Sequence, residues 1–183
     1  MGIACALKNS GVGVGLPDYG RCRLAISDGR VHVYSSASCI GQGVGTVLVQ
    51  IVSEAAGLPI EAIKWHMPNT ATSPDAGTTS GSRQTTLTGE AARRAAKQLR
   101  RDLFRVNGLT YEETSRPSDY LEGVTVEQES PTTESVRFTG SDLDALNGRE
   151  YIGEYLGKTD KMGADVANPV SHVAMVMQPT SVS

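Results

Sequence analysis

The sequence contains few aromatic residues and few cysteines. Only 5% of its 183 residues are aromatic, with a single Trp. The chain has three widely spaced cysteines, Cys5, Cys22 and Cys39. Because their number is odd and no CxxC pair occurs, they indicate neither a disulfide framework nor a cysteine metal site. Three scattered histidines, expected to be ordinary strand or loop residues, are His32, His66 and His172.

Long apolar runs and an excess of positive charge are also absent. The apolar runs are a few residues long, far short of the ~20 that span a bilayer, and the first residues lack the pattern of a signal peptide. The net charge is −3, whereas a general nucleic-acid binder needs a basic face. We therefore expect a cytoplasmic protein that binds neither membranes nor nucleic acid. The length and the 39% hydrophobic content predict one globular domain.

Turn residues and periodicity organise the first half of the chain. Two alternating runs, 22–26 and 31–34, flank an Asp-Gly turn, which is typical of a β-hairpin. Apolar residues then recur every three or four positions from Val44 to Ala55, which predicts an amphipathic helix ending at Gly57. Residues 60–66 are predicted to form a strand. A second helix is predicted over 89–106, with Thr88 as its N-cap.

The signal weakens beyond residue 107. The predicted elements there are short strands at 124–126 and 136–138, a short capped helix at 141–146, an extended surface connection over 151–171 and a strand at 173–177. Five cations on the second helix are predicted to form its solvated face: Arg93, Arg94, Lys97, Arg100 and Arg101. The pair Glu112-Glu113 is likewise expected to be solvated.

A glycine-rich turn, residues 39–46, connects the predicted hairpin to the first helix. A turn that opens a helix exposes backbone N–H groups at the positive end of the helix dipole, which suits an anion or a polar ring edge. Gln42 adds an amide that both donates and accepts. The glycine spacing matches neither GxGxxG nor the Walker pattern. Taken alone, the turn is also consistent with a plain strand-to-helix connection.

A hydroxyl-rich segment precedes the second helix. Ten of the 22 residues from 69 to 90 are Ser or Thr, and three more are Gly. Many short donors with little side-chain bulk can wrap a phosphate or a polar heterocycle, although the same composition also fits a flexible loop. Because both glycine-containing segments lead into a helix, we expect them to converge on one ligand. No Ser/His/Asp set or other catalytic group is nominated, nor is a metal ligand.

In order and spacing these segments resemble the molybdenum hydroxylases. The resemblance rests on Gly41-Gln42-Gly43 before a helix ending at Gly57-Leu58-Pro59, then Pro68-Asn69-Thr70, then Gly81-Ser82-Arg83 before a long helix. This is the xanthine dehydrogenase and aldehyde oxidase family, with its carbon-monoxide dehydrogenase branch. Residues 1–183 are thereby identified as a molybdopterin-binding domain of the large subunit, with a best-matched core at 1–106 and a less regular extension at 107–183. The implied fold is α+β, with two main helices packed in a second layer on a mixed or antiparallel sheet.

The resemblance also implies a set of cofactor-binding residues. Gly41, Gln42 and Gly43 would hold the pterin of molybdopterin, which in some members is a dinucleotide. The second segment would face the pterin and phosphate through Thr79, Ser80, Ser82, Arg83 and Gln84, and Gly81 would lie close to the metal. The glycine stretch 11–15 is not part of the common pattern and receives no role.

The family hydroxylates a carbon of an aldehyde or N-heterocycle with oxygen from water. Its base is a Glu beyond the matched region, and its iron–sulfur and flavin groups belong to other domains or subunits. The expected partners are therefore the remainder of the molybdenum subunit and these redox domains, and the chain is expected to be inactive alone. The alternative is a non-catalytic nucleotide- or phosphate-binding or assembly module that uses the same two segments.

Overall fold

A computed structural model describes residues 2–9, 16–117, 125–157, 159–161, 163, 165 and 173–180. The glycine stretch 11–15 and His172 lie outside these residues. The strands are β1 (Gly2–Asn9), β2 (Asp18–Ser27), β3 (Arg30–Tyr34), β4 (Ile63–Trp65), β5 (Glu113–Pro117), β6 (Thr125–Glu129), β7 (Glu150–Gly157) and β8 (Val173–Thr180). The α-helices are α1 (Val44–Ala56), α2 (Gln84–Val106) and α3 (Pro131–Ser135), and the 3-10 helices are η1 (Ile60–Ala62) and η2 (Gly140–Leu146).

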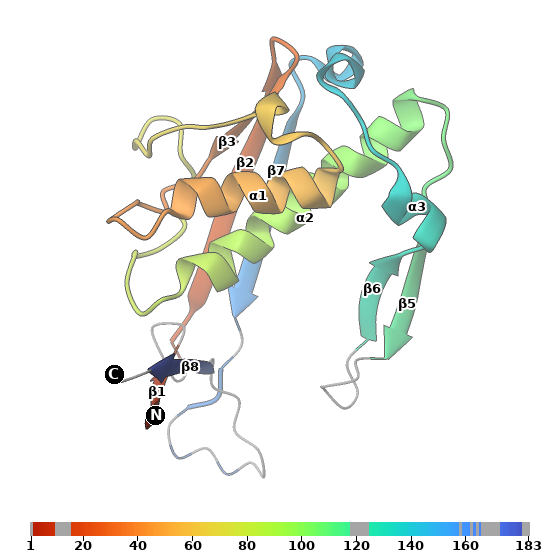
Figure 1. Ribbon diagram of the computed structural model, residues 1–183. Helices are drawn as coiled ribbons and strands as arrows, with labels where there is room; N and C mark the ends of the chain where they lie inside the picture. The colour runs from red at the N-terminus through yellow and green to blue at the C-terminus, as the bar shows by residue number, and fades with distance from the viewer. Residues whose placement is uncertain are drawn as a thin grey trace.

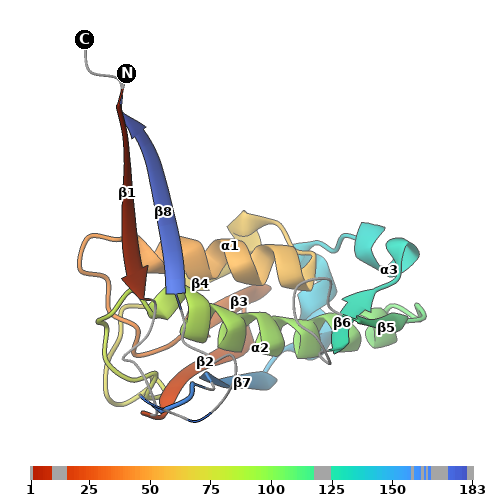
Figure 2. The same ribbon diagram turned by 90° about the horizontal axis from the view of Figure 1, so that it is seen from below.

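The main sheet has four strands in the order β4-β3-β2-β7. β2 pairs antiparallel with β3 and with β7, whereas β3 and β4 are parallel. Helices α1 and α2 lie across one face of this sheet (Figures 1 and 2). The predicted α+β fold, with two main helices forming a second layer on a mixed sheet, is confirmed.

The predicted hairpin is present as β2 and β3. Asp28 and Gly29 both have positive φ, 52° and 65°, which is the turn geometry that matches the twist of a two-residue hairpin. Leu24 on β2 pairs with Val33 on β3, and both side chains are fully buried beneath the helices. Helix α1 also begins and ends as predicted, because Gly57 takes a left-handed conformation and its N–H donates to Ser53 O.

Helix α2 begins at Gln84, five residues before the predicted start. Thr88 therefore lies inside the helix and is not its N-cap. Its hydroxyl donates to the side-chain oxygen of Gln84, one turn earlier, and its side chain is fully buried. The Thr-rich first turn of α2 lacks the apolar period that predicts a helix, so the sequence pattern places the start of this helix too late.

Strand β7 contradicts the predicted surface connection over 151–171, because its whole length pairs with β2. Two glycines explain both the packing and the weak signal. A Cβ at Gly20 on β2 would come within 2.3 Å of the Leu87 backbone, and one at Gly153 on β7 within 1.9 Å of Ala91 O. Helix α2 thus packs directly on backbone at these two positions, where a buried strand normally presents large apolar residues.

The remaining local predictions are partly wrong. Residues 60–66 form η1 followed by the short strand β4, and residues 136–138 form no strand. The helix near 141–146 is the 3-10 helix η2, capped by Thr139 together with Asp142. Strand β6 contains the described part of the predicted 124–126 strand, and β8 confirms the strand at 173–177 by pairing antiparallel with β1.

The cations of α2 do not all form a solvated face. Arg100 is 1% exposed, and its guanidinium binds Glu129 on β6 at 2.8 Å, Ala56 O at 3.0 Å and Thr133 O at 2.5 Å. Glu113, expected to be solvated, accepts from Lys97 and Arg101. These ion pairs attach the chain beyond α2 to the helix layer. No helix in the described part of the chain is long and apolar enough to cross a membrane.

Candidate functional site

Two loops lie side by side at the end of the molecule where α1 and α2 begin (Figure 1). The first loop, residues 35–43, connects β3 to α1, and the second loop, residues 66–83, connects β4 to α2. Thr79 joins them, because its hydroxyl oxygen accepts from the Ser38 N–H at 3.0 Å. A second bridge runs from the Ala76 N–H to the Ser36 hydroxyl at 2.7 Å. The structure thus brings together the two segments that the sequence predicts to converge.

Two glycines of the first loop expose their backbone to unoccupied space. Gly41 and Gly43 have φ of 107° and 74°, and a Cβ at either position would meet no atom within 4 Å. Gln42 is exposed, and its amide shapes the loop by accepting from the Ile40 N–H at 2.6 Å and donating to Ser38 O at 2.9 Å. A ligand can therefore approach the backbone at this turn closely.

Cys39 shows that the first loop stabilises negative charge. The pKa of its exposed thiol is lowered because the backbone N–H of Gly41 donates to it, with further donation from Gly43 and Val44. These N–H groups lie at the positive end of α1, which also favours an anion. The sequence interpretation missed Cys39, although its position just before a glycine-rich helix start is a usable signal.

The second loop places hydroxyl groups at the start of α2. Gly81 and Ser82 have consecutive positive φ values, 64° and 53°, and a non-glycine residue in this conformation is uncommon and often marks a functional site. Ser80 and Ser82 are exposed, as are Thr85 and Thr86 in the first turn of the helix. These hydroxyls surround the N-terminus of a 23-residue helix, where an anion is favoured.

Two predicted site residues lie beneath the second loop instead of on its surface. Arg83 is 2% exposed and Gln84 is 5% exposed. The Gln84 amide donates to Thr78 O at 3.2 Å and to the Thr79 hydroxyl at 3.1 Å. Of the predicted residues, the structure therefore brings Gly41, Gln42, Gly43, Thr79, Ser80, Gly81 and Ser82 to or near the surface, and it buries the other two.

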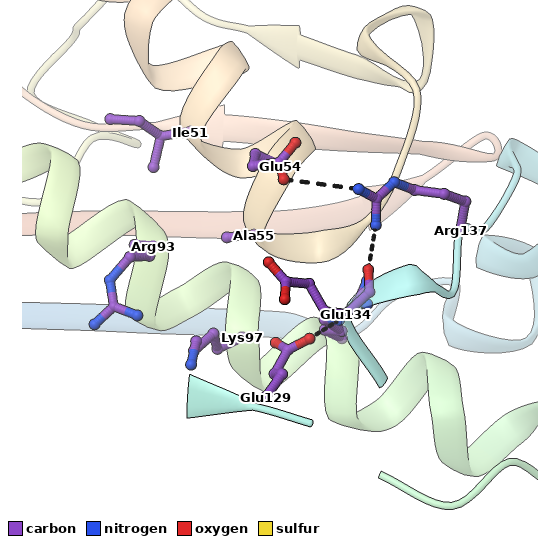
Figure 3. A pocket seen from close by; sticks show the side chains of 9 residues that line it. Ile51, Glu54, Ala55, Arg93, Lys97, Glu129, Glu134 and Arg137 are labelled. Carbon is purple, nitrogen blue, oxygen red and sulfur yellow. Dashed lines mark hydrogen bonds and ion pairs between the residues drawn. The ribbon is translucent and has the colours of Figure 1, made fainter. Parts of the chain in front are cut away.

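A cavity of about 400 Å³ lies elsewhere, between α1, α2 and the segment from β6 to Arg137 (Figure 3). None of the predicted site residues lines it. All four of its cationic side chains are already in ion pairs: Arg100 binds Glu129 at 2.8 Å, and Arg137 lies 3.7 Å from Glu54. Arg93 and Lys97 pair with Glu90 and Glu113 outside the cavity. This mutual pairing leaves the cavity less suited to an anionic ligand than the two loops.

Two of the three histidines, His32 and His66, contact each other, which no sequence pattern predicts. His32 Nδ1 lies 2.7 Å from His66 Nε2, and Tyr34 stacks on the His66 ring at 4.6 Å. The pKa of His66 is lowered, first by burial and then by the nearby His32 and Lys64. Among the residues that the structure describes, no group of three or more His, Cys, Asp or Glu is arranged to hold a metal ion.

Comparison with known proteins finds one family match and two curated relatives. A family model described as a molybdopterin cofactor-binding domain matches residues 1–164. The chain is 33% identical over 118 residues to an aldehyde oxidoreductase of Megalodesulfovibrio gigas, covering 61% of this chain and 13% of that protein. It is 36% identical over 96 residues to the 6-hydroxypseudooxynicotine dehydrogenase complex subunit gamma of Paenarthrobacter nicotinovorans, covering 52% of this chain and 12% of the subunit.

A solved structure shows the same fold. The aldehyde oxidoreductase from Desulfovibrio desulfuricans superposes with a TM-score of 0.59 at 19% identity, over 96% of this chain and 18% of that one. The chain thus spans between about an eighth and a fifth of the length of these similar proteins.

Proposed function

The chain belongs to the molybdopterin cofactor-binding domain family, and we propose that its two loops form one wall of the cofactor site of a molybdenum hydroxylase. One observation carries this proposal: Thr79 joins the first loop to the second at the point where two helices begin. A single ligand lying across this junction would meet both helix N-termini at once. Phosphate and pterin are both rich in groups that accept hydrogen bonds from such N–H donors.

The residues present fit this cofactor. Open space borders Gly41 and Gly43, so a flat ring can lie against the backbone there. The lowered pKa of Cys39, which has backbone N–H donation from Gly41 as its main cause, supports a turn that favours negative charge. The exposed hydroxyls of Ser80 and Ser82 supply donors on the other side of the junction.

Each loop has its own part in holding the cofactor. The backbone of Gly41 and Gly43 binds the pterin edge, and Gln42 keeps that turn in shape through its two amide hydrogen bonds. Thr79, Ser80 and Ser82 would bind the pterin and phosphate region, and Gly81 would leave room for the metal. When bound, the molybdenum group supplies the chemistry that hydroxylates a substrate carbon with oxygen from water.

The proposal extends to a larger enzyme. Because the chain spans a small share of its relatives, the substrate-activating base and half of the pterin contacts are assigned to the remainder of a molybdenum subunit, and electron transfer to iron–sulfur and flavin domains. One relative is named as a subunit of a dehydrogenase complex, which agrees with this division. An aldehyde or N-heterocycle is the proposed substrate class, in the manner of aldehyde oxidoreductases or xanthine dehydrogenases, and the proposed location is the cytoplasm.

A double substitution tests the site. Gln42→Ala combined with Ser82→Ala, made in the intact enzyme, removes one amide and one hydroxyl from opposite sides of the junction. We expect molybdenum and pterin content, measured on the purified protein, to fall at least threefold. The matched control is Gln50→Ala with Ser141→Ala, two exposed positions outside the loops, which should retain full occupancy.

Normal occupancy in the Gln42/Ser82 variant would refute the site assignment. The alternative module makes a different prediction, since it requires the purified chain to bind a nucleotide with micromolar or better affinity. Calorimetric titration with nucleotides separates the two proposals: binding of a free nucleotide without retention of pterin would favour the module.

A further inference from the structure

Arg83 connects three parts of the chain beneath the second loop. Its Nε–H donates to the carboxylate of Asp18 at the start of β2, and its Nη2 donates to Tyr19 O. Its Nη1 donates to Ala76 O at 2.7 Å and to Thr78 O at 2.8 Å. The Arg83 and Asp18 side chains are 2% and 1% exposed, so a buried ion pair anchors the loop to the first residues of the sheet.

The loop is built around this guanidinium. Ala76 and Thr78 bind it at one end of segment 76–82, and Arg83 itself follows the other end, so one group closes the segment. Gly77 lies directly over it, with φ of 71°, and a Cβ there would come within 3.0 Å of both Nη atoms. A side chain at position 77 would therefore crowd the guanidinium and would also adopt a strained left-handed backbone, and the two effects together account for the glycine.

We propose that Arg83 is a positioning residue: paired with Asp18, it presets segment 76–82 in the shape that receives the cofactor, without touching the cofactor. This inference rests on the proposed function and replaces the direct phosphate contact expected of Arg83. The role needs a guanidinium, because a planar fork can donate to one carboxylate and three carbonyls at once. A lysine ammonium has three donors at a single point and cannot span these acceptors.

Amide hydrogen exchange on the full chain, without cofactor, tests the first half of the proposal. In Arg83→Lys, peptides covering 76–82 should exchange at least tenfold faster than in the unmodified chain, and in Asp18→Asn at least threefold faster. Peptides covering 24–33 of the β2–β3 hairpin should change less than twofold in both. The control is Arg21→Lys, the same substitution at an exposed ion pair on β2, which should leave both regions unchanged.

Cofactor release from the intact, cofactor-loaded protein tests the second half. Molybdopterin should dissociate at least tenfold faster from Arg83→Lys than from the unmodified protein, and Arg21→Lys should match the unmodified rate. If Arg83→Lys fails to fold, Asp18→Asn, which preserves the shape of the side chain, carries both measurements.

Two results would overturn the positioning role. One is exchange that accelerates equally in the loop and the hairpin, since that indicates a general loss of stability. The other is a loosened loop that still releases cofactor at the unmodified rate. An unmodified protein that holds no molybdopterin would instead refute the proposed function, while the exchange data would still decide whether Arg83 orders the loop.

Discussion

At the scale of single residues, the N–H groups of the first loop matter most. Backbone N–H donation from Gly41, Gly43 and Val44 lowers the pKa of Cys39, and the same turn is proposed to hold the pterin. The reactivity of the Cys39 thiol therefore reports on the electrostatics of the turn. A bound cofactor would accept hydrogen bonds from the same N–H groups. This makes Cys39 a convenient chemical probe of the site.

The pH dependence of Cys39 alkylation should reflect the lowered pKa of its thiol. Since hydrogen bonds from backbone N–H groups stabilise the thiolate, a larger fraction of Cys39 is ionised at pH 7.5 than of an ordinary cysteine. We expect the midpoint of its iodoacetamide rate against pH to lie below the ordinary value of 9.0, measured by mass spectrometry of the Cys39 peptide. Cys22 serves as internal control, because complete burial raises its pKa to about 12 and it should stay unmodified. A Cys39 midpoint at or above 9.0 would contradict the geometry.

His66 should titrate below its ordinary value of 6.5, because burial and the charges of His32 and Lys64 disfavour its protonated form. The folded pKa is thus below the unfolded one, so this residue's contribution to stability is present above pH 6.5 and is lost as the pH falls. NMR titration of the ring protons measures the midpoint, which should rise in His32→Asn. An unchanged midpoint in that variant would show that His32 does not influence His66.

At the scale of elements, neighbouring arginines on α2 have opposite surroundings. Arg100 is buried and holds Glu129 and several carbonyl groups, which links α2 to β6 and α3. Arg101 is 46% exposed and pairs with Glu113 at the surface. Arg100 thus holds the segment beyond α2 through buried contacts, whereas Arg101 forms an ion pair at the surface.

Replacing these two arginines should separate the two roles. Arg100→Leu leaves the nearly buried Glu129 carboxylate without its cationic partner, with only the Tyr111 hydroxyl still donating to it. We expect this substitution to lower the free energy of unfolding by about 3 kcal/mol. Arg101→Leu removes a surface ion pair and should cost less than about 1 kcal/mol. Urea denaturation followed by circular dichroism gives both values. If both substitutions lowered the free energy of unfolding equally, Arg100 would not stabilise the packing of the segment beyond α2.

Local signals predicted some elements well and others poorly. Helix α1 was recognised because its period and Gly57 lie within one short stretch. Strand β7 was missed because its inward-facing positions include Gly153, which α2 requires to be small, so the usual apolar alternation is broken. The burial of Arg83 could not be foreseen either, since its partner Asp18 lies 65 positions away in sequence. Hydrophobic periodicity predicts structure that is determined by residues close in sequence. It does not predict contacts between residues that are far apart in sequence.

At the scale of the whole molecule, the main sheet is covered on one face by two helices that begin at the same end (Figure 2). This arrangement gathers two helix N-termini and two loops into one surface, although the loops are separated in sequence by α1 and β4. The chain belongs to the molybdopterin cofactor-binding domain family over residues 1–164, and that surface is the one proposed to bind the cofactor. The two segments predicted from the sequence to converge do lie side by side, but only the structure distinguishes the residues on their surface from those beneath.

The most direct test of this account is an experimental structure of the intact enzyme with its molybdopterin bound. We predict that the cofactor lies across the junction of the two loops, with polar atoms within hydrogen-bond distance of both the Gly41–Gly43 turn and the Thr79–Ser82 segment, and with Arg83 beneath them making no contact with it. A cofactor that touches neither loop, or that binds in the cavity between α1, α2 and β6, would contradict the account.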